Sequence, residues 1–151
     1  MKFYIDTSVF GGYWDEEFKE ETRAFFEYVS NNNEELVYSD ITAEELIGAP
    51  ERVRELEKKL EDKGIRMQLI EIDEEGERLA KVYIKEGALT KKYENDARHI
   101  ALASVHGGVK ALVSWNFKHM VNFRRQEEYN QINARLGYKD INIRTPKEML
   151  P

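Results

Sequence analysis

The chain has 151 residues, 34% of them charged, and a formal net charge of −6 at pH 7. This length is that of one ordinary domain, and we expect residues 1–151 to form a single domain. The absence of cysteine excludes disulfides, cysteine-ligated zinc and thiol nucleophiles. The acidic balance counts against nucleic-acid binding unless basic residues cluster, because affinity for phosphate comes from lysine and arginine.

The sequence also bears on where the protein works. It shows neither a secretory signal nor an apolar run of about 20 residues, the length that spans a membrane. The lack of cysteine suits a reducing compartment. We therefore expect a cytoplasmic protein with no membrane association.

Short apolar runs alternate along the chain with amphipathic stretches. Runs rich in strand-forming residues predict strands at residues 1–5, 36–39, 66–72, 111–114 and 141–144. Apolar residues at helical spacing predict helices at about 16–30, 42–47, 53–63, 73–86, 95–106 and 117–136. Gly11–Trp14 is predicted as a loop and Lys91–Glu94 as a polar link. Alternating strands and helices predict an α/β fold, with a parallel sheet flanked by helices on both faces.

The first strand ends abruptly at Asp6, which two hydroxyl residues, Thr7 and Ser8, follow. In an open α/β sheet, ligands bind outside the carboxyl ends of the strands, which is where Asp6 falls. An Asp in this place also commonly caps the turn that follows. The functional interpretation gains support because other polar side chains occupy comparable positions later in the chain.

Three further residues join Asp6 in this pattern. Glu45 opens the helix after the second strand, Asp96 lies in the first turn of the 95–106 helix, and Asn116 follows the 111–114 strand. One cleft at the sheet edge can hold all four side chains. Two carboxylates ~4 Å apart at an effective dielectric near 20 repel by about 4 kcal/mol, so we expect a raised pKa for at least one acid. Carboxylates with an amide suit Mg²⁺ or Mn²⁺ as the neutralising ion.

Each of these positions also has a purely structural explanation. Thr42 to Glu45 matches a capping box, in which the Glu reaches back to the Thr42 backbone N–H. Asp96 in a first helical turn favours the helix dipole without any further role. Asn116 after a strand is also a common turn residue.

Histidines and basic residues surround the same positions. His99 lies one turn after Asp96 and is expected beside the acids or on the substrate side, whereas His106 and His119 resemble ordinary surface histidines. The basic residues gather after Asn116 and around Asp96, at Lys118, Arg124, Arg125, Lys91, Lys92 and Arg98. Such residues can bind phosphate and offset the acidic charge locally, although a solvated helix face explains them equally well.

Four segments of the chain resemble, in order and spacing, the successive motifs of PIN-domain ribonucleases, in particular the VapC-like toxins of prokaryotic toxin–antitoxin systems. The segments are Asp6–Ser8, Ser39–Leu46, Asn95–Ala103 and Leu112–Asn116. Each motif is short, but the four together cover nearly the whole chain.

This resemblance implies a parallel sheet of about five strands and a Mg²⁺- or Mn²⁺-dependent endoribonuclease site. It also implies RNA as substrate, a homodimer and a small antitoxin as partner. By motif, Asp6 and Asp96 match the most constant metal-site acids, and Glu45 matches the family's Glu better than Glu44 does. Asp6, Glu45 and Asp96 are therefore the expected metal ligands, with Asn116 as a fourth catalytic residue.

The resemblance is imperfect at Asn116, which stands where many members have Asp. The missing charge puts a fully occupied second metal site in doubt. Ser8 and Ser114 match hydroxyl positions that orient the acids. The expected substrate-side residues are Ser8, His99, Ser114, Lys118 and His119.

The leading hypothesis is thus a metal-dependent endoribonuclease, with a toxin as one such case. A second hypothesis, which Asn116 supports, is a catalytically weak PIN-like module that binds RNA or a protein. A third is a receiver-like phosphoacceptor domain, whose fold also places acids at strand ends. The lack of an acidic pair beside Asp6, and of a lysine in residues 111–114, counts against the third.

Overall fold

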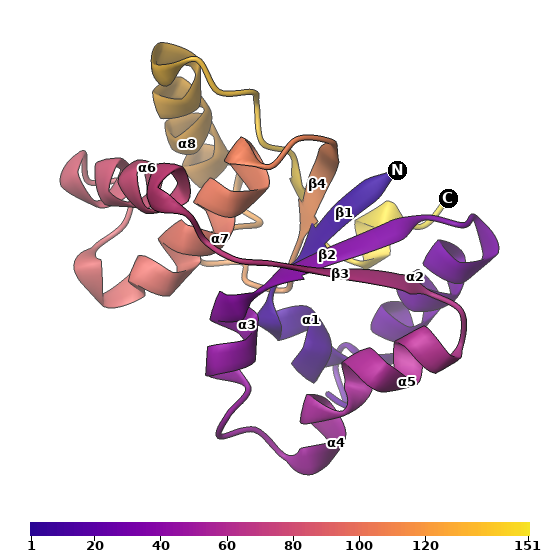
Figure 1. The fold of residues 1–151 in the computed structure, drawn as a ribbon. Helices are drawn as coiled ribbons and strands as arrows, with labels where there is room; N and C mark the ends of the chain where they lie inside the picture. Colours follow the sequence, from indigo (N-terminus) through magenta and orange to yellow (C-terminus); the bar gives the residue numbers. More distant parts are fainter.

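The computed structural model describes residues 1–151 and contains one five-stranded sheet in the order β3-β2-β1-β4-β5. Every paired strand is parallel to its neighbour. The strands are β1 (Lys2–Ile5), β2 (Glu35–Ser39), β3 (Arg66–Ile70), β4 (Val109–Val113) and β5 (Ile143–Arg144). The predicted parallel α/β sheet flanked by helices is confirmed (Figure 1).

Helices cover both faces of this sheet (Figure 1). One face packs against α1 (Thr7–Gly12), α2 (Lys19–Asn31), α4 (Glu51–Arg54) and α5 (Leu56–Asp62). The other packs against α6 (Glu74–Lys85), α7 (Glu94–Val105) and α8 (Phe123–Leu136). The helix α3 (Asp40–Glu45) follows β2 directly, and two short 3-10 helices complete the chain, η1 (Lys91–Tyr93) and η2 (Lys147–Met149).

The central strand β1 explains why the sheet needs two helical layers. Successive side chains of a strand point to opposite faces. Tyr4 accordingly enters the core beneath α6, α7 and α8, whereas Phe3 and Ile5 enter the core beneath α1, α2 and α5. A strand that is apolar on both faces, without alternation, is the pattern of a buried parallel sheet.

Several element boundaries differ from those predicted. Gly11 and Gly12 belong to α1, so the expected loop begins later. The single helix expected at 53–63 is two short helices, α4 and α5. The 117–136 stretch begins with turns, and α8 starts only at Phe123, where the Asn122 side chain accepts a hydrogen bond from the Arg125 N–H as its N-cap.

The most consequential shift concerns α3, which was expected to begin at Thr42 and instead begins at Asp40. Its N-cap is Ser39, whose Oγ accepts a hydrogen bond from the Ile41 N–H at 3.2 Å. Both Ser39 and Thr42 can cap, and the hydroxyl of Ser39, the last residue of β2, does so. Glu45 is consequently the last residue of α3 rather than part of its first turn.

The strand order also decides against one hypothesis. Receiver domains have the doubly wound order 2-1-3-4-5. The order here is 3-2-1-4-5, so the receiver-like interpretation is wrong. In addition, none of the helices combines the length and the apolarity needed to cross a membrane.

Candidate active site

The site lies where β1, β2 and β4 end. Asp6 follows β1 directly, and its backbone N–H donates to the Val113 carbonyl at the end of the neighbouring strand β4 (3.3 Å). Asp96 lies in the first turn of α7, as expected. Glu45 reaches the same region from the end of α3. Three elements therefore bring the acids to one edge of the sheet.

Asp6 is buried, with 4% of its surface exposed. Its Oδ1 accepts a hydrogen bond from the Ser8 hydroxyl at 2.6 Å, and its Oδ2 accepts one from Ser114 at 2.7 Å. The same two hydroxyl oxygens accept backbone N–H groups, Ser8 from Trp115 (2.8 Å) and Ser114 from Asn116 (2.9 Å). The serines therefore fix Asp6 to the loop after β4.

The pKa of Asp6 is raised, as the sequence led us to expect for one of the acids. The main cause is different, however. Burial raises the pKa most, the nearby His99 and the hydroxyls of Ser8 and Ser114 lower it, and the Asp96 charge adds a smaller increase. Desolvation, more than repulsion between carboxylates, sets the ionisation of Asp6.

This raised pKa predicts a pH-dependent stability in metal-free protein. The folded protein holds the Asp6 proton more tightly than the unfolded chain does, so ionisation of Asp6 costs stability. This loss of stability is absent below pH ~3.9, the pKa of an Asp in an unfolded chain. It grows as the pH rises towards the pKa of Asp6 in the folded protein, and it persists at higher pH. Asn at position 6 cannot ionise and therefore avoids this loss. In EDTA, we expect the melting temperature of Asp6→Asn minus that of the wild type to increase as the pH rises between these two pKa values. An ion that binds only the native state raises the melting temperature, so, if these acids hold Mg²⁺, its addition at neutral pH should raise that of the wild type.

The relevant measurement is the slope of the melting-temperature difference against pH, recorded from about pH 4 to pH 8. The amide rearranges the hydrogen bonds of Ser8 and Ser114, which adds an offset that does not depend on pH. Parallel curves for wild type and Asp6→Asn would contradict the prediction.

Glu45 is held by a chain of hydrogen bonds that starts inside the core. Its Oε1 accepts from the Thr7 hydroxyl at 2.7 Å and from Nε2 of His99 at 2.8 Å. Nε2 of His99 donates to this carboxylate, and Nδ1 on the other side of the ring lies within hydrogen-bond distance of the Tyr4 hydroxyl, at 2.6 Å. That hydroxyl lies 2.7 Å from Ser39 Oγ. His99 is 1% exposed, so its ring contacts Glu45 and Tyr4 rather than solvent.

These contacts decide between the interpretations of Glu45. Burial alone raises its pKa, but the hydrogen bond and charge of His99 and the Thr7 hydroxyl outweigh burial, and the pKa of Glu45 is lowered. Its carboxylate bonds to side chains of β1–α1 and α7, and Thr42 is not the N-cap of α3. The capping-box explanation is therefore wrong.

Asp96 is held by a histidine and an amide from the loop after β4. Its Oδ2 accepts from Nδ1 of His119 at 2.8 Å and from Nδ2 of Asn116 at 3.2 Å. The Asn116 Oδ1 in turn accepts the His119 backbone N–H at 3.0 Å. Both ends of the Asn116 amide are thus engaged within the protein, which makes Asn116 a positioning residue for Asp96 in this structure. The expectation that His119 is a surface histidine is wrong, because only 5% of it is exposed.

The acids do not form a ready ligand cluster in these side-chain positions. No group of three His, Cys, Asp or Glu side chains is gathered closely enough to hold a metal ion. Each acid is instead fixed by its own donors. The hydrogen bonds to Glu45 and Asp96 go to one oxygen of each, Oε1 and Oδ2, which leaves Oε2 and Oδ1 without a donor from the chain. Their side chains are 30% and 20% exposed.

A family model describing the PIN domain matches residues 3–119 of the chain. The chain belongs to the PIN domain family. Comparison with curated proteins gives no match. Among solved structures, a chain of VapBC2 from Rickettsia felis, crystallised bound to a DNA fragment from their promoter, is similar, with a TM-score of 0.55 and 14% sequence identity. The alignment covers 96% of this chain and 98% of the other, so this PIN domain shares that fold over its full length.

Basic side chains of the PIN domain line a small polar pocket in the segment that follows Asn116. The pocket, of about 380 Å³, is lined by Lys118, Asn122, Arg124, Arg125 and Glu128. The Lys118 ammonium lies 5.2 Å from the centre of the Tyr93 ring, and that ring contacts His119 at 4.0 Å between centroids. The predicted grouping of basic residues after Asn116 is thus found. Arg98 is instead engaged with Glu77 at 3.1 Å.

The substrate-side residues proposed from sequence divide by burial. His99, Ser114 and His119 are buried, and their polar atoms hold the three acids, as described above. Ser8 also bonds to Asp6. Lys118 is exposed and is the member of this set that remains available to a substrate.

Two residues that sequence reasoning missed complete the hydrogen-bond chain to Glu45. Tyr4 lies inside an apolar run, where nothing distinguishes a functional hydroxyl from a core ring. Thr7 stands within the first motif, next to Asp6, and this position was the available signal.

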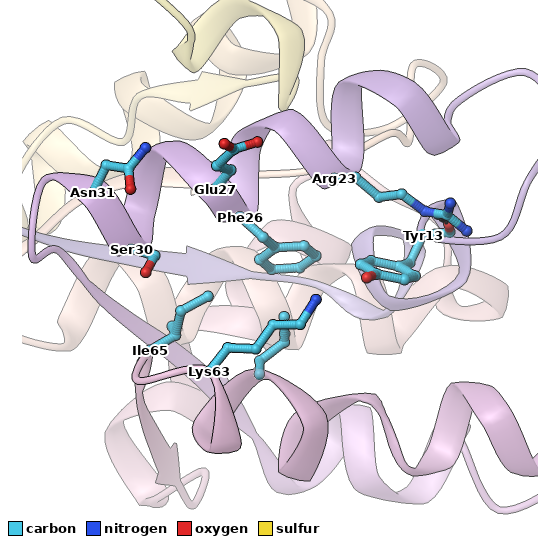
Figure 2. Close-up of a pocket in the computed structure, with 9 residues that line it drawn as sticks. Tyr13, Arg23, Phe26, Glu27, Ser30, Asn31, Lys63 and Ile65 are labelled. Atoms are coloured by element: carbon cyan, nitrogen blue, oxygen red, sulfur yellow. Dashed lines mark hydrogen bonds between the residues drawn. The ribbon is translucent and has the colours of Figure 1, made fainter.

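A separate pocket of about 360 Å³ lies between α2 and the end of α5, where Arg23 and Lys63 flank Tyr13 and Phe26 (Figure 2). The Arg23 guanidinium lies 4.6 Å from the centre of the Tyr13 ring, and its Nε donates to the Tyr13 carbonyl at 2.9 Å. None of the four proposed catalytic residues lines this pocket. The acids at the sheet edge therefore remain the candidate active site of the PIN domain.

Proposed function

We propose that this PIN domain is a metal-dependent endoribonuclease that hydrolyses phosphodiester bonds, with Asp6, Glu45 and Asp96 as the ligands of Mg²⁺ or Mn²⁺. The observation that carries the proposal is the convergence of these three acids, from β1, α3 and α7, at one edge of the sheet. Each acid is held by donors from the protein, and two of them retain an oxygen with no such donor. Oriented carboxylates of this kind are expected where a cation binds.

The donor set fits a hard divalent cation. Carboxylate oxygens are the preferred protein ligands of Mg²⁺ and Mn²⁺, and the site contains no sulfur. When bound, such an ion activates water and stabilises the phosphodiester oxygens during in-line attack.

The chain's own residues supply orientation and charge. Ser8 and Ser114 fix Asp6, His99 fixes Glu45, and His119 fixes Asp96. Lys118 and the arginines of the adjacent pocket offer positive charge to the RNA backbone. This grouping of basic side chains provides local positive charge in a chain that is acidic as a whole.

We further propose that the protein is the toxin of a toxin–antitoxin pair, acting in the cytoplasm as a homodimer with a small antitoxin as partner. The support is the fold shared with a chain of the VapBC2 complex. Co-purification with the product of a neighbouring small gene, and the mass of the isolated chain in solution, would test the partner and the dimer separately.

Cleavage of a labelled RNA mixture tests the nuclease proposal directly. We expect cleavage with Mn²⁺ or Mg²⁺, none in EDTA, and recovery when excess metal is returned. An Asp6→Asn preparation made identically controls for contaminating nuclease. RNA that binds but remains intact with either metal would contradict the proposal and favour the catalytically weak binding module.

A further inference from the structure

The loop after β4 presents alternate side chains to the acids and to solvent. Asn116 and His119 turn inward and hydrogen-bond to Asp96. Between them, Phe117 and Lys118 are exposed, and 51% of the Phe117 surface is open to solvent. Since consecutive Cα atoms are ~3.8 Å apart, this exposed ring is attached directly beside the candidate active site.

Phe117 does not stand alone but rests beside two stacked rings. Phe18 and Trp115 stack with centroids 4.3 Å apart and planes at 19°. The Phe117 centroid lies 6.3 Å from each of them. Phe117 is therefore the exposed edge of an aromatic cluster that continues into the protein.

The base of this cluster is closely packed and hydrogen-bonded. The Trp115 indole N–H donates to the Thr22 hydroxyl at 2.9 Å. A Cβ on Gly12 would lie 2.8 Å from the indole, so the ring is seated directly against the α1 backbone. A fixed aromatic surface binds a flat ligand with little loss of conformational freedom.

The chemistry beside the cluster indicates what the ligand is. Lys118 adds a positive charge immediately after Phe117 and lines a pocket with Arg124, Arg125 and Glu128, where three cations outnumber one carboxylate, which lies 3.8 Å from Arg125. A flat π-surface beside cations matches a nucleobase with its adjoining phosphate. In a duplex the bases are stacked on one another, whereas unpaired bases are free to stack on aromatic side chains.

We propose that Phe117, backed by Phe18 and Trp115, is a stacking platform for an unpaired nucleobase next to the scissile phosphate. This inference rests on the proposed nuclease function, but the platform binds the base whether or not the acids cut the chain. Binding measured without cleavage therefore tests it separately.

The experiment compares Phe117→Ala, Phe117→Trp and a matched control, Phe123→Ala. Phe123 is also an exposed phenylalanine, at 79%, and it lies at the start of α8 outside the aromatic cluster. Each protein is titrated in EDTA and at low salt with a single-stranded oligoribonucleotide and with the same sequence as a duplex. Melting temperatures of the variants establish that they remain folded.

We expect Phe117→Ala to bind the single strand about 5- to 100-fold more weakly than wild type, while Phe123→Ala binds normally. Phe117→Trp should retain affinity, and its added indole fluorescence should be quenched by the single strand more than by the duplex. RNA binding that survives Phe117→Ala, or falls equally in Phe123→Ala, would overturn the platform. A change in oligomeric state with unchanged RNA binding would also overturn it and make Phe117 a protein contact. If the Phe117 variants bind RNA as expected but the wild type does not cleave RNA with Mn²⁺ or Mg²⁺, the nuclease proposal is wrong and the stacking platform stands.

Discussion

Replacing Asp96 by Asn is expected to lower RNA cleavage by more than about 100-fold, because loss of residues that merely support metal ligands already costs 10–100-fold. Folding should survive the change. The carbonyl oxygen of the new amide can take the place of Oδ2, where His119 and Asn116 donate, and the amide nitrogen then replaces Oδ1, which has no donor from the chain. The substitution thus removes a carboxylate ligand with little disturbance of the surrounding hydrogen bonds.

The measurement is the initial cleavage rate with Mn²⁺, together with the melting temperature in EDTA. Asp140→Asn is the matched control, since Asp140 is exposed in the segment between α8 and β5 and lines a different pocket. The control should cleave at the wild-type rate. Wild-type cleavage by the Asp96→Asn variant would remove Asp96 from the proposed ligand set.

The general position of the acids could be predicted because the topology leaves little choice. In a parallel sheet all strands point the same way, so residues following β1 and β4 meet at one edge. Asp6 and Ser114 follow these adjacent strands, and their side chains meet at 2.7 Å. The apolar runs and their alternation with helices were enough to predict that geometry.

The detailed contacts could not be predicted because they depend on loops and helix starts. Both Ser39 and Thr42 are competent N-caps, and a shift of the start from Thr42 to Asp40 moves Glu45 from the first turn of α3 to its end. His119 is buried on Asp96 because the 117–122 segment turns before α8 begins. The helical spacing of apolar residues does not reveal such a turn, so the sequence predicted that His119 lies on the surface of a helix.

The hydrogen-bond chain behind Glu45 shows a second limit. Tyr4 counts as apolar in any pattern of strand residues, yet its hydroxyl connects Ser39 to His99 across two elements. Only the folded arrangement of β1, β2 and α7 brings these groups together. Sequence patterns therefore predicted the acids better than the neutral residues that orient them.

Glu45→Gln is expected to lower cleavage by more than about 100-fold as well, because an amide replaces a carboxylate ligand of a hard cation. The Gln carbonyl can still accept from Thr7 and His99 at the Oε1 position, and the amide nitrogen then occupies the Oε2 position. The metal-free protein should therefore melt close to the wild-type temperature. Because the hydrogen bonds to His99 and Thr7 lower the pKa of Glu45, the wild-type carboxylate is ionised at neutral pH, so the substitution removes a full negative charge from the site.

Glu44→Gln is the matched control for Glu45→Gln. Glu44 is the exposed neighbour of Glu45 on the same helix and the other Glu of the matched motif. Cleavage rates measured over a range of Mn²⁺ concentrations should be normal for Glu44→Gln and strongly reduced for Glu45→Gln, with equal melting temperatures in EDTA. The reverse pattern would assign the ligand to Glu44. Full activity in both variants would show that α3 supplies no acid to the reaction, and the hydrogen bonds from Thr7 and His99 would then serve only to fix α3 against β1 and α7.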